Sequence, residues 1–490
     1  MNFEKEREMP LKLAIIGAGP GGYVAAVRAA QLGGEVTLVE QNHVGGTCLN
    51  WGCIPSKILI HAAELVEQLQ NAPQWGVLLD DQVRIDLQVL MARKQQVIET
   101  QREGLLKIFK HHRIRYLKGR GTLKGPNMAI VTQEDGRTQD VPWDRLILAT
   151  GSQPLTLSSL PFDHKRVLDS SDVLSLTEIP PSLLIVGGGV IGCEFAFVFS
   201  SLGSRVTVVE ALSRILPLPT VDPDISKLIQ REMKKRKVAF MVDRSVENLD
   251  PHGDGVRVTL RPVRAGHGSK STNRGKKTEE VMTLDVDQVV VGVGRRPNTA
   301  SLGLENLGIR LEAEGWIRVN HLMETDVPHV YAIGDLLGPS RPMLAHVATS
   351  EGLVAAENAL GGSRVMSYDA VPSVIFTLPE VADVGMTEAQ ALEAGYNVGS
   401  DTVLLRNLGK AQLLGLIEGQ VKIVWDKKSG RILGVHMVGS RASDLIAEGV
   451  LAVRNGITIA ELAETIHAHP TFSEVMAEAA YKALGMPIHG

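Results

Sequence analysis

Short apolar runs that end in glycine-rich turns open the chain. Residues Lys12–Ile16 form the first apolar run, and the turn Gly17–Gly22 follows it directly. The pattern after this turn predicts a helix to Gln31, and Val36–Val39 predicts a second strand that ends at Glu40. A strand, a helix and a second strand in this order predict a parallel α/β unit.

The same pattern recurs near the middle of the chain. Leu183–Val186 predicts a strand, Gly187–Gly192 a turn, and Val206–Val209 a second strand that ends at Glu210. One G-x-G-x-x-G turn is weak evidence for a nucleotide site, but two turns that each complete such a unit are strong evidence. The glycines let the backbone approach a pyrophosphate at a helix N-terminus, and the glutamate accepts hydrogen bonds from ribose hydroxyls. The sequence therefore predicts two dinucleotide sites.

The acidic residue of the second unit indicates which nicotinamide nucleotide binds there. A carboxylate at Glu210 favours a free ribose 2′-hydroxyl and repels a 2′-phosphate. Arg214 lies four residues later and weakens that inference. Because the carboxylate occupies the discriminating position, we predict NAD rather than NADP.

The remaining pattern divides the chain further. From about Ser367 it changes to alternating strands, as in Val421–Trp425 and Ile432–Val438, followed by helices. Residues 261–278 contain six Lys or Arg and no Asp or Glu, which predicts a flexible, solvated hairpin insertion in the second nucleotide domain. A docking surface for an acidic partner is the alternative for this segment.

Size and composition exclude several classes of protein. A chain of 490 residues suggests about two to four domains. A net charge of −4 gives no indication of nucleic-acid binding, and three cysteines do not make a secreted disulfide framework. The apolar stretch Leu183–Phe199 contains glycines and Glu194, so a buried strand that turns into a helix explains it better than a membrane span. Met1–Pro10 lacks the apolar core of a secretory signal, so we expect a cytoplasmic protein.

Two cysteines directly follow the first nucleotide unit. In a regular helix, Cys48 and Cys53 would lie about 8.6 Å apart, whereas a disulfide needs Cα atoms roughly 4.4–6.8 Å apart. A bonded pair therefore needs a distorted turn, which Gly52 permits. Pro55 suits the first turn of a following helix, where the dipole lowers the pKa of a thiol, and Lys57 adds positive charge. These features favour a reactive pair beside a bound nucleotide.

Two other interpretations of the cysteines compete with this one. A zinc site needs four ligands, and no second cysteine pair exists in the chain. Two unpaired core thiols are the second alternative. Cys193, which follows the second glycine turn, is expected to pack as a small apolar residue without a redox role.

A family resemblance resolves this choice. The run Gly45–Lys57, with the pattern G-G-T-C-x₄-G-C-I-P-S-K, resembles the redox-active disulfide motif of the class I pyridine nucleotide-disulfide oxidoreductases. Within that family the sequence most resembles the dihydrolipoyl dehydrogenases, the E3 components of 2-oxoacid dehydrogenase and glycine cleavage systems. The similarity extends over nearly the whole chain. It implies a Cys48–Cys53 redox disulfide, FAD at the first nucleotide site and NAD at the second.

The resemblance also implies an architecture. The fold class is α/β, with two Rossmann-like domains for FAD and NAD and an α+β dimerisation domain that forms a homodimer. The implied boundaries are residues 1–155 for the first part of the FAD domain, 156–284 for the NAD domain, 285–366 for the return to the FAD and central region, and 367–490 for the interface domain.

Further segments resemble cofactor-binding stretches of the family, in the family's order and spacing. They include residues 146–151, 292–298, 330–335 and 343–346. The implied FAD contacts are Gly17, Gly19, Gly22, Glu40, Thr47, Lys57, Gly121, Thr150, Gly151, Asp335, Met343, Ala345 and His346. The implied NAD contacts are Gly187, Gly189, Gly192, Glu210, Val246 and Gly294.

The sequence near the C-terminus completes the implied active site. The run from His469 to Glu474 matches the family motif H-P-T-x-S-E, in which the histidine is the catalytic base and the glutamate orients it. The resemblance gives His467 no such role and places the pair at the disulfide of the other subunit. Lys57 and Glu194 are expected to form an ion pair near the flavin and the nicotinamide.

The implied reaction oxidises protein-bound dihydrolipoamide. The substrate attacks Cys48, His469 accepts its proton, Cys53 passes electrons to FAD, and NAD⁺ is reduced. The lipoyl group is expected on an acyltransferase (E2) or on the H protein of glycine cleavage. Three related enzymes fit the sequence less well. Glutathione reductases usually need positive residues where Glu210 stands, and mercuric reductases carry a C-terminal cysteine pair, whereas this chain has no cysteine after Cys193. The related transhydrogenase lacks the pair that Cys48 and Cys53 form here. A flavin-bearing scaffold with little turnover is the alternative from another class.

Overall fold

The structure is a computed structural model that describes residues 10–79, 83–263 and 280–489. The chain divides into two units, each made of three segments. The first unit comprises Met1–Ile58, Gln88–Leu155 and Gly294–Ser367. The second comprises Leu59–Leu87, Thr156–Val293 and Tyr368–Gly490.

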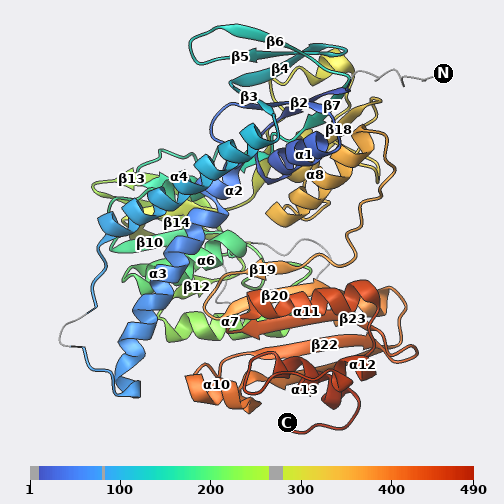
Figure 1. Cartoon of the computed structure of the whole chain (residues 1–490). Helices are drawn as coiled ribbons and strands as arrows, with labels where there is room; N and C mark the ends of the chain where they lie inside the picture. The colour runs from blue at the N-terminus through green and yellow to red at the C-terminus, as the bar shows by residue number, and fades with distance from the viewer. Residues whose placement is uncertain (1–9, 80–82, 264–279, 490) are drawn as a thin grey trace. The chain divides into compact units, whose positions relative to one another are not determined.

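A parallel five-stranded sheet forms the centre of the first unit, with the order β18-β7-β1-β2-β3 (Figure 1). Strands β1, β7 and β18 are mostly apolar and buried, because other elements cover both faces of the sheet there, whereas the edge strand β3 has no buried residue. The glycine turn after β1 leads into α1, which packs against α8. The bounds are β1 Lys12–Ile16, β2 Glu35–Glu40, β3 Arg115–Lys118, β7 Arg145–Leu148, β18 Val330–Ala332, α1 Pro20–Gln31 and α8 Ala345–Ala359.

Further elements of the first unit surround this sheet. Strands β4 (Arg120–Gly125), β5 (Met128–Thr132) and β6 (Thr138–Pro142) form an antiparallel sheet. Strands β8 (Ser152–Pro154) and β17 (Arg295–Pro297) pair where the chain leaves and re-enters the unit. The helices are α2 (Gly46–Trp51), α4 (Leu87–His111) and α3 (Cys53–Asn71), which continues into the second unit.

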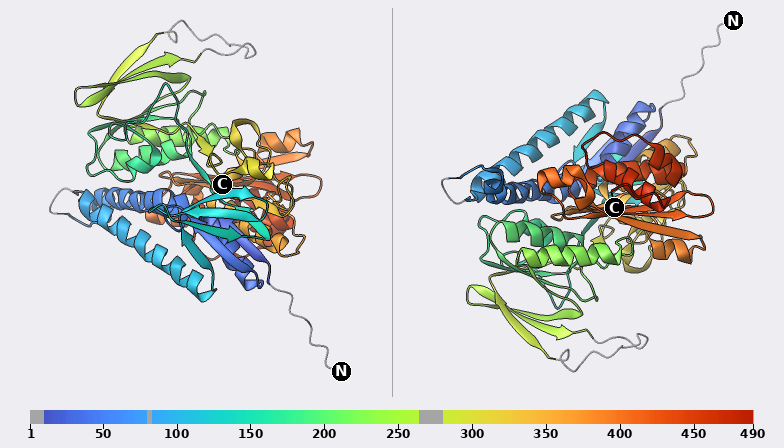
Figure 2. Two further views of the ribbon diagram at one scale, coloured as in Figure 1. Left: turned by 90° about the horizontal axis from the view of Figure 1, so that it is seen from above. Right: turned by 90° about the horizontal axis from the view of Figure 1, so that it is seen from below.

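The second unit contains another parallel sheet, in the order β12-β11-β10-β16-β9. Apolar residues of β10, β11 and β16 pack against β14 of a separate antiparallel sheet, β13-β14-β15, visible in Figure 2. The strands are β9 Val167–Leu168, β10 Ser182–Val186, β11 Arg205–Val209, β12 Ala239–Met241, β13 Arg244–His252, β14 Gly255–Pro262, β15 Met282–Val286 and β16 Gln288–Val291. The helices are α5 Ser170–Val173, α6 Val190–Ser201 and α7 Pro223–Lys235.

The position of β16 differs from the sequence-based boundary at residue 284. The sequence assigned residues from 285 onward to the return segment, but β16 pairs in parallel with β10. The chain re-enters the first unit only at Gly294. The physical reason is that Val289, Val290 and Val291 complete the buried centre of the second sheet.

The last segment of the second unit forms an antiparallel sheet with helices, β19-β20-β23-β22-β21. The strands are β19 Ser373–Ile375, β20 Glu380–Gly385, β21 Val398–Leu404, β22 Gln420–Asp426 and β23 Ile432–Gly439. The helices are α9 Glu388–Glu393, α10 Gly409–Leu414, α11 Ala442–Asn455, α12 Ile459–Glu464 and α13 Glu474–Ala483. Two parallel sheets, each with a glycine turn after a central strand, and this α+β part confirm the predicted fold class.

The structure describes only the flanks of the predicted basic insertion. The predicted basic insertion, 261–278, falls largely outside the described residues, which stop at 263 and resume at 280. The alternative that this segment is a docking surface for an acidic partner therefore also concerns residues outside the described ranges. The strands on either side, β14 and β15, pair in antiparallel fashion. Among the described residues, no helix has the length and apolar character that a membrane crossing requires.

Candidate active site

A cavity of about 470 Å³ lies at the carboxyl ends of β1 and β2. Ligands of α/β folds bind at this edge of a parallel sheet. Gly22, Lys57 and His346, also implied as FAD contacts, are not among its lining residues. The implied FAD contacts that line it are Gly17, Gly19, Glu40, Thr47, Gly121, Thr150, Gly151, Asp335, Met343 and Ala345.

Three glycines at or beside this cavity lie so close to neighbouring backbone atoms that no side chain would fit. A Cβ atom at Gly17 would lie 2.2 Å from the carbonyl oxygen of Ala149, and one at Gly46 would lie 2.6 Å from Cα of Gly19. A Cβ atom at Gly22 would lie 1.9 Å from the carbonyl oxygen of Gly17, so Gly22 packs α1 against the turn. The narrow glycine-lined surface fits a pyrophosphate-bearing dinucleotide such as FAD.

Glu40 ends β2 at the rim of this cavity. Its two carboxylate oxygens accept the N–H groups of Ala18 and Asn42, each at 2.8 Å. Burial raises the pKa of Glu40, although these hydrogen bonds oppose the rise. The bonds fix the carboxylate beside the glycine turn, where its remaining lone pairs can accept ribose hydroxyls.

Two polar side chains that the sequence did not indicate, Ser152 and Arg295, hold Asp335 in place. Ser152 Oγ donates to Asp335 Oδ2 at 2.6 Å, and Arg295 Nε donates to Ser152 Oγ at 2.6 Å. Arg295 also lies 3.7 Å from Asp335 Oδ2. Because these residues are far apart along the chain, no local pattern reveals the group.

The predicted cysteine pair lines the same cavity. Cys48 lies in α2 and Cys53 begins α3, and Gly52 between the helices has φ −141° and ψ −111°, which breaks the helical geometry. Both cysteines are thiols here. The hydrogen bond with Cys53 and then burial raise the pKa of Cys48, despite the charge of Lys57. The expected lowering of the thiol pKa is therefore not found for Cys48 in this dithiol form.

A second cavity, of about 350 Å³, opens beside Cys48 on the side of α4. No motif in the sequence indicated this cavity. Its signal is the stripe Gln101, Gly104, Leu105 and Ile108, which has the i, i+3, i+4, i+7 spacing of one helix face. The other lining residues are Pro20, Tyr23, Gly45, Leu49 and Ile54, so no charged side chain among the described residues lines it.

The second glycine turn repeats the arrangement of the first. Glu210 is 7% exposed, and its carboxylate accepts the N–H groups of Gly188 at 2.6 Å and Leu212 at 2.8 Å. Arg214, which weakened the inference of NAD, donates to the carbonyl oxygens of Leu218 and Val221 at 2.9 and 3.0 Å. Both bonds come from Nη2, whereas Nη1 of Arg214 is buried without a hydrogen-bond partner among the described residues.

The other implied NAD contacts lie in different surroundings. A Cβ atom at Gly192 would lie 1.9 Å from the carbonyl oxygen of Gly187, so this glycine packs α6 against the turn. Gly189 has open space where a Cβ would stand. Val246 is in β13 and packs against the apolar centre of the second unit, whereas Gly294 belongs to the first unit.

The predicted histidine and glutamate lie side by side. His469 Nδ1 hydrogen-bonds to Glu474 Oε1 at 2.7 Å, and the other glutamate oxygen accepts the N–H of Thr471 at 2.8 Å. Burial raises the pKa of Glu474, but the hydrogen bonds from His469 and Thr471 outweigh it, so the net pKa lies below its ordinary value. The imidazole is 75% exposed and offers Nε2 for proton exchange.

His467, for which no catalytic role is expected, is held in place by two hydrogen bonds. Its Nε2 hydrogen-bonds to Glu448 Oε1 at 2.8 Å, and its Nδ1 to the carbonyl oxygen of Thr465 at 2.8 Å. The side chain is only 7% exposed. These contacts hold the segment that carries His469.

The remaining predicted residues lie in separate places. Glu194, on α6, is buried and accepts the N–H of Phe376 at 3.0 Å. Lys57 belongs to the first unit and Glu194 to the second, so their ion pair stays a prediction. Cys193 is fully buried, and burial raises its thiol pKa, which agrees with a packing role.

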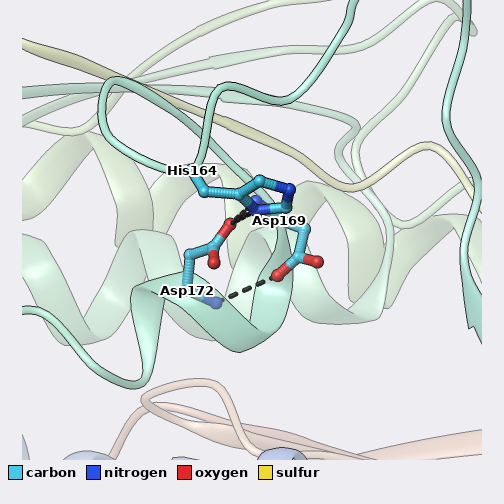
Figure 3. A group of neighbouring side chains, drawn as sticks. All are labelled: His164, Asp169 and Asp172. Carbon is cyan, nitrogen blue, oxygen red and sulfur yellow. Dashed lines mark hydrogen bonds and ion pairs between the residues drawn. The ribbon is translucent and has the colours of Figure 1, made fainter.

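His164, Asp169 and Asp172 bring their ligand atoms within 4.8 Å of one another (Figure 3). Asp169 caps α5 by accepting the N–H groups of Ser171 at 2.6 Å and Asp172 at 2.9 Å. Asp172 accepts the N–H of Asp169 at 2.8 Å and pairs with His164 Nδ1 at 2.9 Å. Helix capping therefore explains the two aspartates, and His164 pairs with one of them.

Comparison with known proteins agrees with this geometry. Residues 11–352 match the family described as pyridine nucleotide-disulphide oxidoreductase, and residues 371–480 match its dimerisation domain, so the chain forms a homodimer. Dihydrolipoyl dehydrogenase of Chlamydia muridarum is 41% identical, covering 97% of each chain. Dihydrolipoyl dehydrogenase 2, mitochondrial, of Arabidopsis thaliana is 40% identical, covering 97% of this chain and 91% of that one.

A solved structure gives the same result at the level of the fold. The crystal structure of LpdA from Mycobacterium tuberculosis superposes with a TM-score of 0.87 at 29% identity, covering 96% of this chain and 99% of that one. Two nucleotide turns, a cysteine pair at the first and a dimerisation domain occur together here as in that family. The chain therefore belongs to the pyridine nucleotide-disulphide oxidoreductases, a family that implies FAD and NAD as cofactors.

Proposed function

We propose that this protein oxidises dihydrolipoyl groups to the cyclic disulfide and reduces NAD⁺. Its relatives with about two fifths identity are named dihydrolipoyl dehydrogenase. The cysteine pair lines the cavity that fits FAD. Both observations support a dithiol–disulfide reaction coupled to a dinucleotide.

The uncharged cavity beside Cys48 is the feature that favours one substrate over another. The dithiol end of a lipoyl group is a hydrocarbon chain with two sulfurs, which apolar side chains such as Leu49, Leu105 and Ile108 accommodate. Glutathione disulfide carries several charges, and a charge buried without a partner is strongly unfavourable. An uncharged, mostly apolar lining therefore favours a lipoyl substrate over glutathione.

The cysteines perform the exchange in two steps. A substrate thiolate attacks Cys48 Sγ of the oxidised pair, the Cys48–Cys53 bond breaks, and Cys53 leaves as a thiolate. The second substrate thiolate attacks the substrate sulfur bonded to Cys48, which closes the substrate ring and releases Cys48. The substrate loses two electrons and two protons, and the electrons reside in the reduced cysteine pair.

His469 of the partner subunit accepts a substrate proton in this exchange. Thiolates are the reactive species, so a base that works near neutral pH accelerates the reaction. Glu474 orients the ring through Nδ1 and leaves Nε2 for the substrate proton. In this proposal each active site needs two subunits.

The cofactor residues complete the proposed site. FAD, when bound, supplies the two-electron chemistry between the cysteine pair and NAD⁺. Glu40 and Asp335 would hold its ribose and its ribityl or pyrophosphate region, and Glu210 would hold the ribose of NAD. Lys57 and Glu194 would supply a positive and a negative charge for the flavin and nicotinamide chemistry.

The proposed partners carry the lipoyl group. They are an acyltransferase (E2) or the H protein of glycine cleavage, because these proteins bear lipoyl arms. The proposed compartment is the cytoplasm, where cysteines stay reduced. Fractionation of the source cells checks the compartment, and recovery inside an organelle such as the mitochondrion would overturn it.

One pair of assays tests the proposed function. Purified holoenzyme receives dihydrolipoamide with NAD⁺ in one assay, and oxidised glutathione with NADPH in the other. We expect rapid NADH formation in the first assay and turnover at least about 10³-fold slower in the second, because charge burial and the Glu210 carboxylate both oppose it. Faster NADPH oxidation than NAD⁺ reduction would refute the assignment.

A further inference from the structure

Helix α4 reaches across to the turn that holds the two cysteines. Arg102 Nε donates to Asn50 Oδ1 at 2.5 Å, although these residues are 52 positions apart in the sequence. Asn50 is 6% exposed and lies in α2, between Cys48 and Cys53. A charged donor thus contacts the redox turn directly.

Asn50 fastens the turn internally as well. Its Nδ2 donates to the carbonyl oxygens of Gly46 at 2.7 Å and Val44 at 3.1 Å. Gly45 N–H also donates to the carbonyl oxygen of Ala18, at 2.8 Å, in the first glycine turn. The Asn50 amide therefore uses both donors and its oxygen inside a buried site, and Arg102 is the side chain from another element that completes it.

The guanidinium also influences a neighbour on the same turn. After burial, the charge of Arg102 contributes to lowering the pKa of His43. The ring of His43 lies 5.9 Å from that of Trp51, the residue after Asn50. Arg102 therefore acts on the segment that precedes the cysteines as well as on the segment between them.

We propose that Arg102 is a positioning residue that holds the Cys48–Cys53 turn in the geometry for disulfide closure. The proposal rests on the proposed redox role of the two cysteines. A turn fixed at both ends keeps the sulfurs at high effective concentration, which favours the disulfide. Because α4 also lines the cavity beside Cys48, one helix supports both the turn and the substrate site.

The test compares Arg102→Met with Lys107→Met, which removes the same charge from an exposed position of the same helix. The FAD-loaded protein is equilibrated without NAD⁺ in mixtures of oxidised and reduced dithiothreitol, and Cys48 and Cys53 are counted as thiol or disulfide by alkylation and mass spectrometry. We expect Arg102→Met to lower the equilibrium constant for disulfide formation about tenfold, equal to about 30 mV for a two-electron couple. Arg102→Lys should recover part of this loss, and Lys107→Met should match the wild type.

A second variant keeps the test decisive if Arg102→Met fails to fold. Asn50→Ala removes the oxygen that accepts Arg102 Nε, so the disulfide should again be disfavoured about tenfold. Equal constants for wild type and for whichever of Arg102→Met and Asn50→Ala folds would overturn the proposal. A wild type that never forms the Cys48–Cys53 bond would instead refute the proposed function, which separates the two failures.

Discussion

Carboxylates that accept backbone N–H groups recur at three parts of the proposed site. Glu40 and Glu210 each accept two such groups near a glycine turn. Glu474 accepts one from Thr471 and also pairs with His469. In each case the backbone N–H groups fix the carboxylate. The carboxylate is therefore already oriented before a ribose binds or before the imidazole accepts a proton.

Replacing Glu474 by Gln should separate orientation from stability. The pKa of Glu474 is depressed in the folded protein, so its ionised form stabilises the fold above its ordinary pKa of about 4.3 and loses this effect as pH falls through the lower folded value. We expect Glu474→Gln to lower the free energy of unfolding by about 0.2–1 kcal/mol at pH 7, with the difference vanishing in acid. Urea unfolding at several pH values measures this.

The same variant should slow the dithiol half-reaction about 10²-fold, because the imidazole loses its orienting partner. Glu478→Gln is the matched control, since Glu478 lies one helical turn later and pairs with His489 Nδ1 at 2.7 Å. It should leave the half-reaction near the wild-type rate. Equal losses in the two variants, measured by stopped flow, would show that Glu474 has no special role.

At the scale of elements, the sequence predicts what is local and misses what is distant. Both strand–turn–helix units follow from glycine spacing, apolar runs and a terminal glutamate, and the structure contains them. The strand β16 joins a sheet whose other members lie far earlier in the chain, so no local pattern assigns it. The same reason hides Arg102 on α4, because its contact with Asn50 depends on how two helices meet.

Chemical detail at the site was also only partly predictable. The sequence places Cys48, Cys53, His469 and Glu474 in motifs. The stripe of residues on α4 is visible in the sequence as well, but no local pattern shows that it lies beside Cys48 and lines a cavity there. The raised pKa of Cys48 depends on its contact with Cys53 and on burial, which are properties of the folded chain. The interaction of Arg214 with carbonyl oxygens likewise requires the loop conformation.

At the scale of the whole molecule, the proposed active site spans two subunits of the dimer. Co-expressed Cys48→Ser and His469→Gln chains with different tags allow the mixed dimer to be isolated. That dimer has one site with intact Cys48 and His469, provided these residues come from opposite subunits. We expect about half the wild-type rate per dimer, since one of two sites works. A mixed dimer as inactive as the two parents would place both residues in the same subunit.

The central claim is that Cys48 and Cys53 form the disulfide that dihydrolipoamide reduces. The most direct measurement adds dihydrolipoamide to the oxidised, FAD-loaded protein without oxygen or NAD⁺, traps thiols by alkylation and maps them by mass spectrometry. We expect a Cys48–Cys53 disulfide before addition and two alkylated thiols afterwards, with buried Cys193 unmodified in the native protein. Two free thiols in the oxidised protein, or a disulfide that dihydrolipoamide leaves intact, would contradict it.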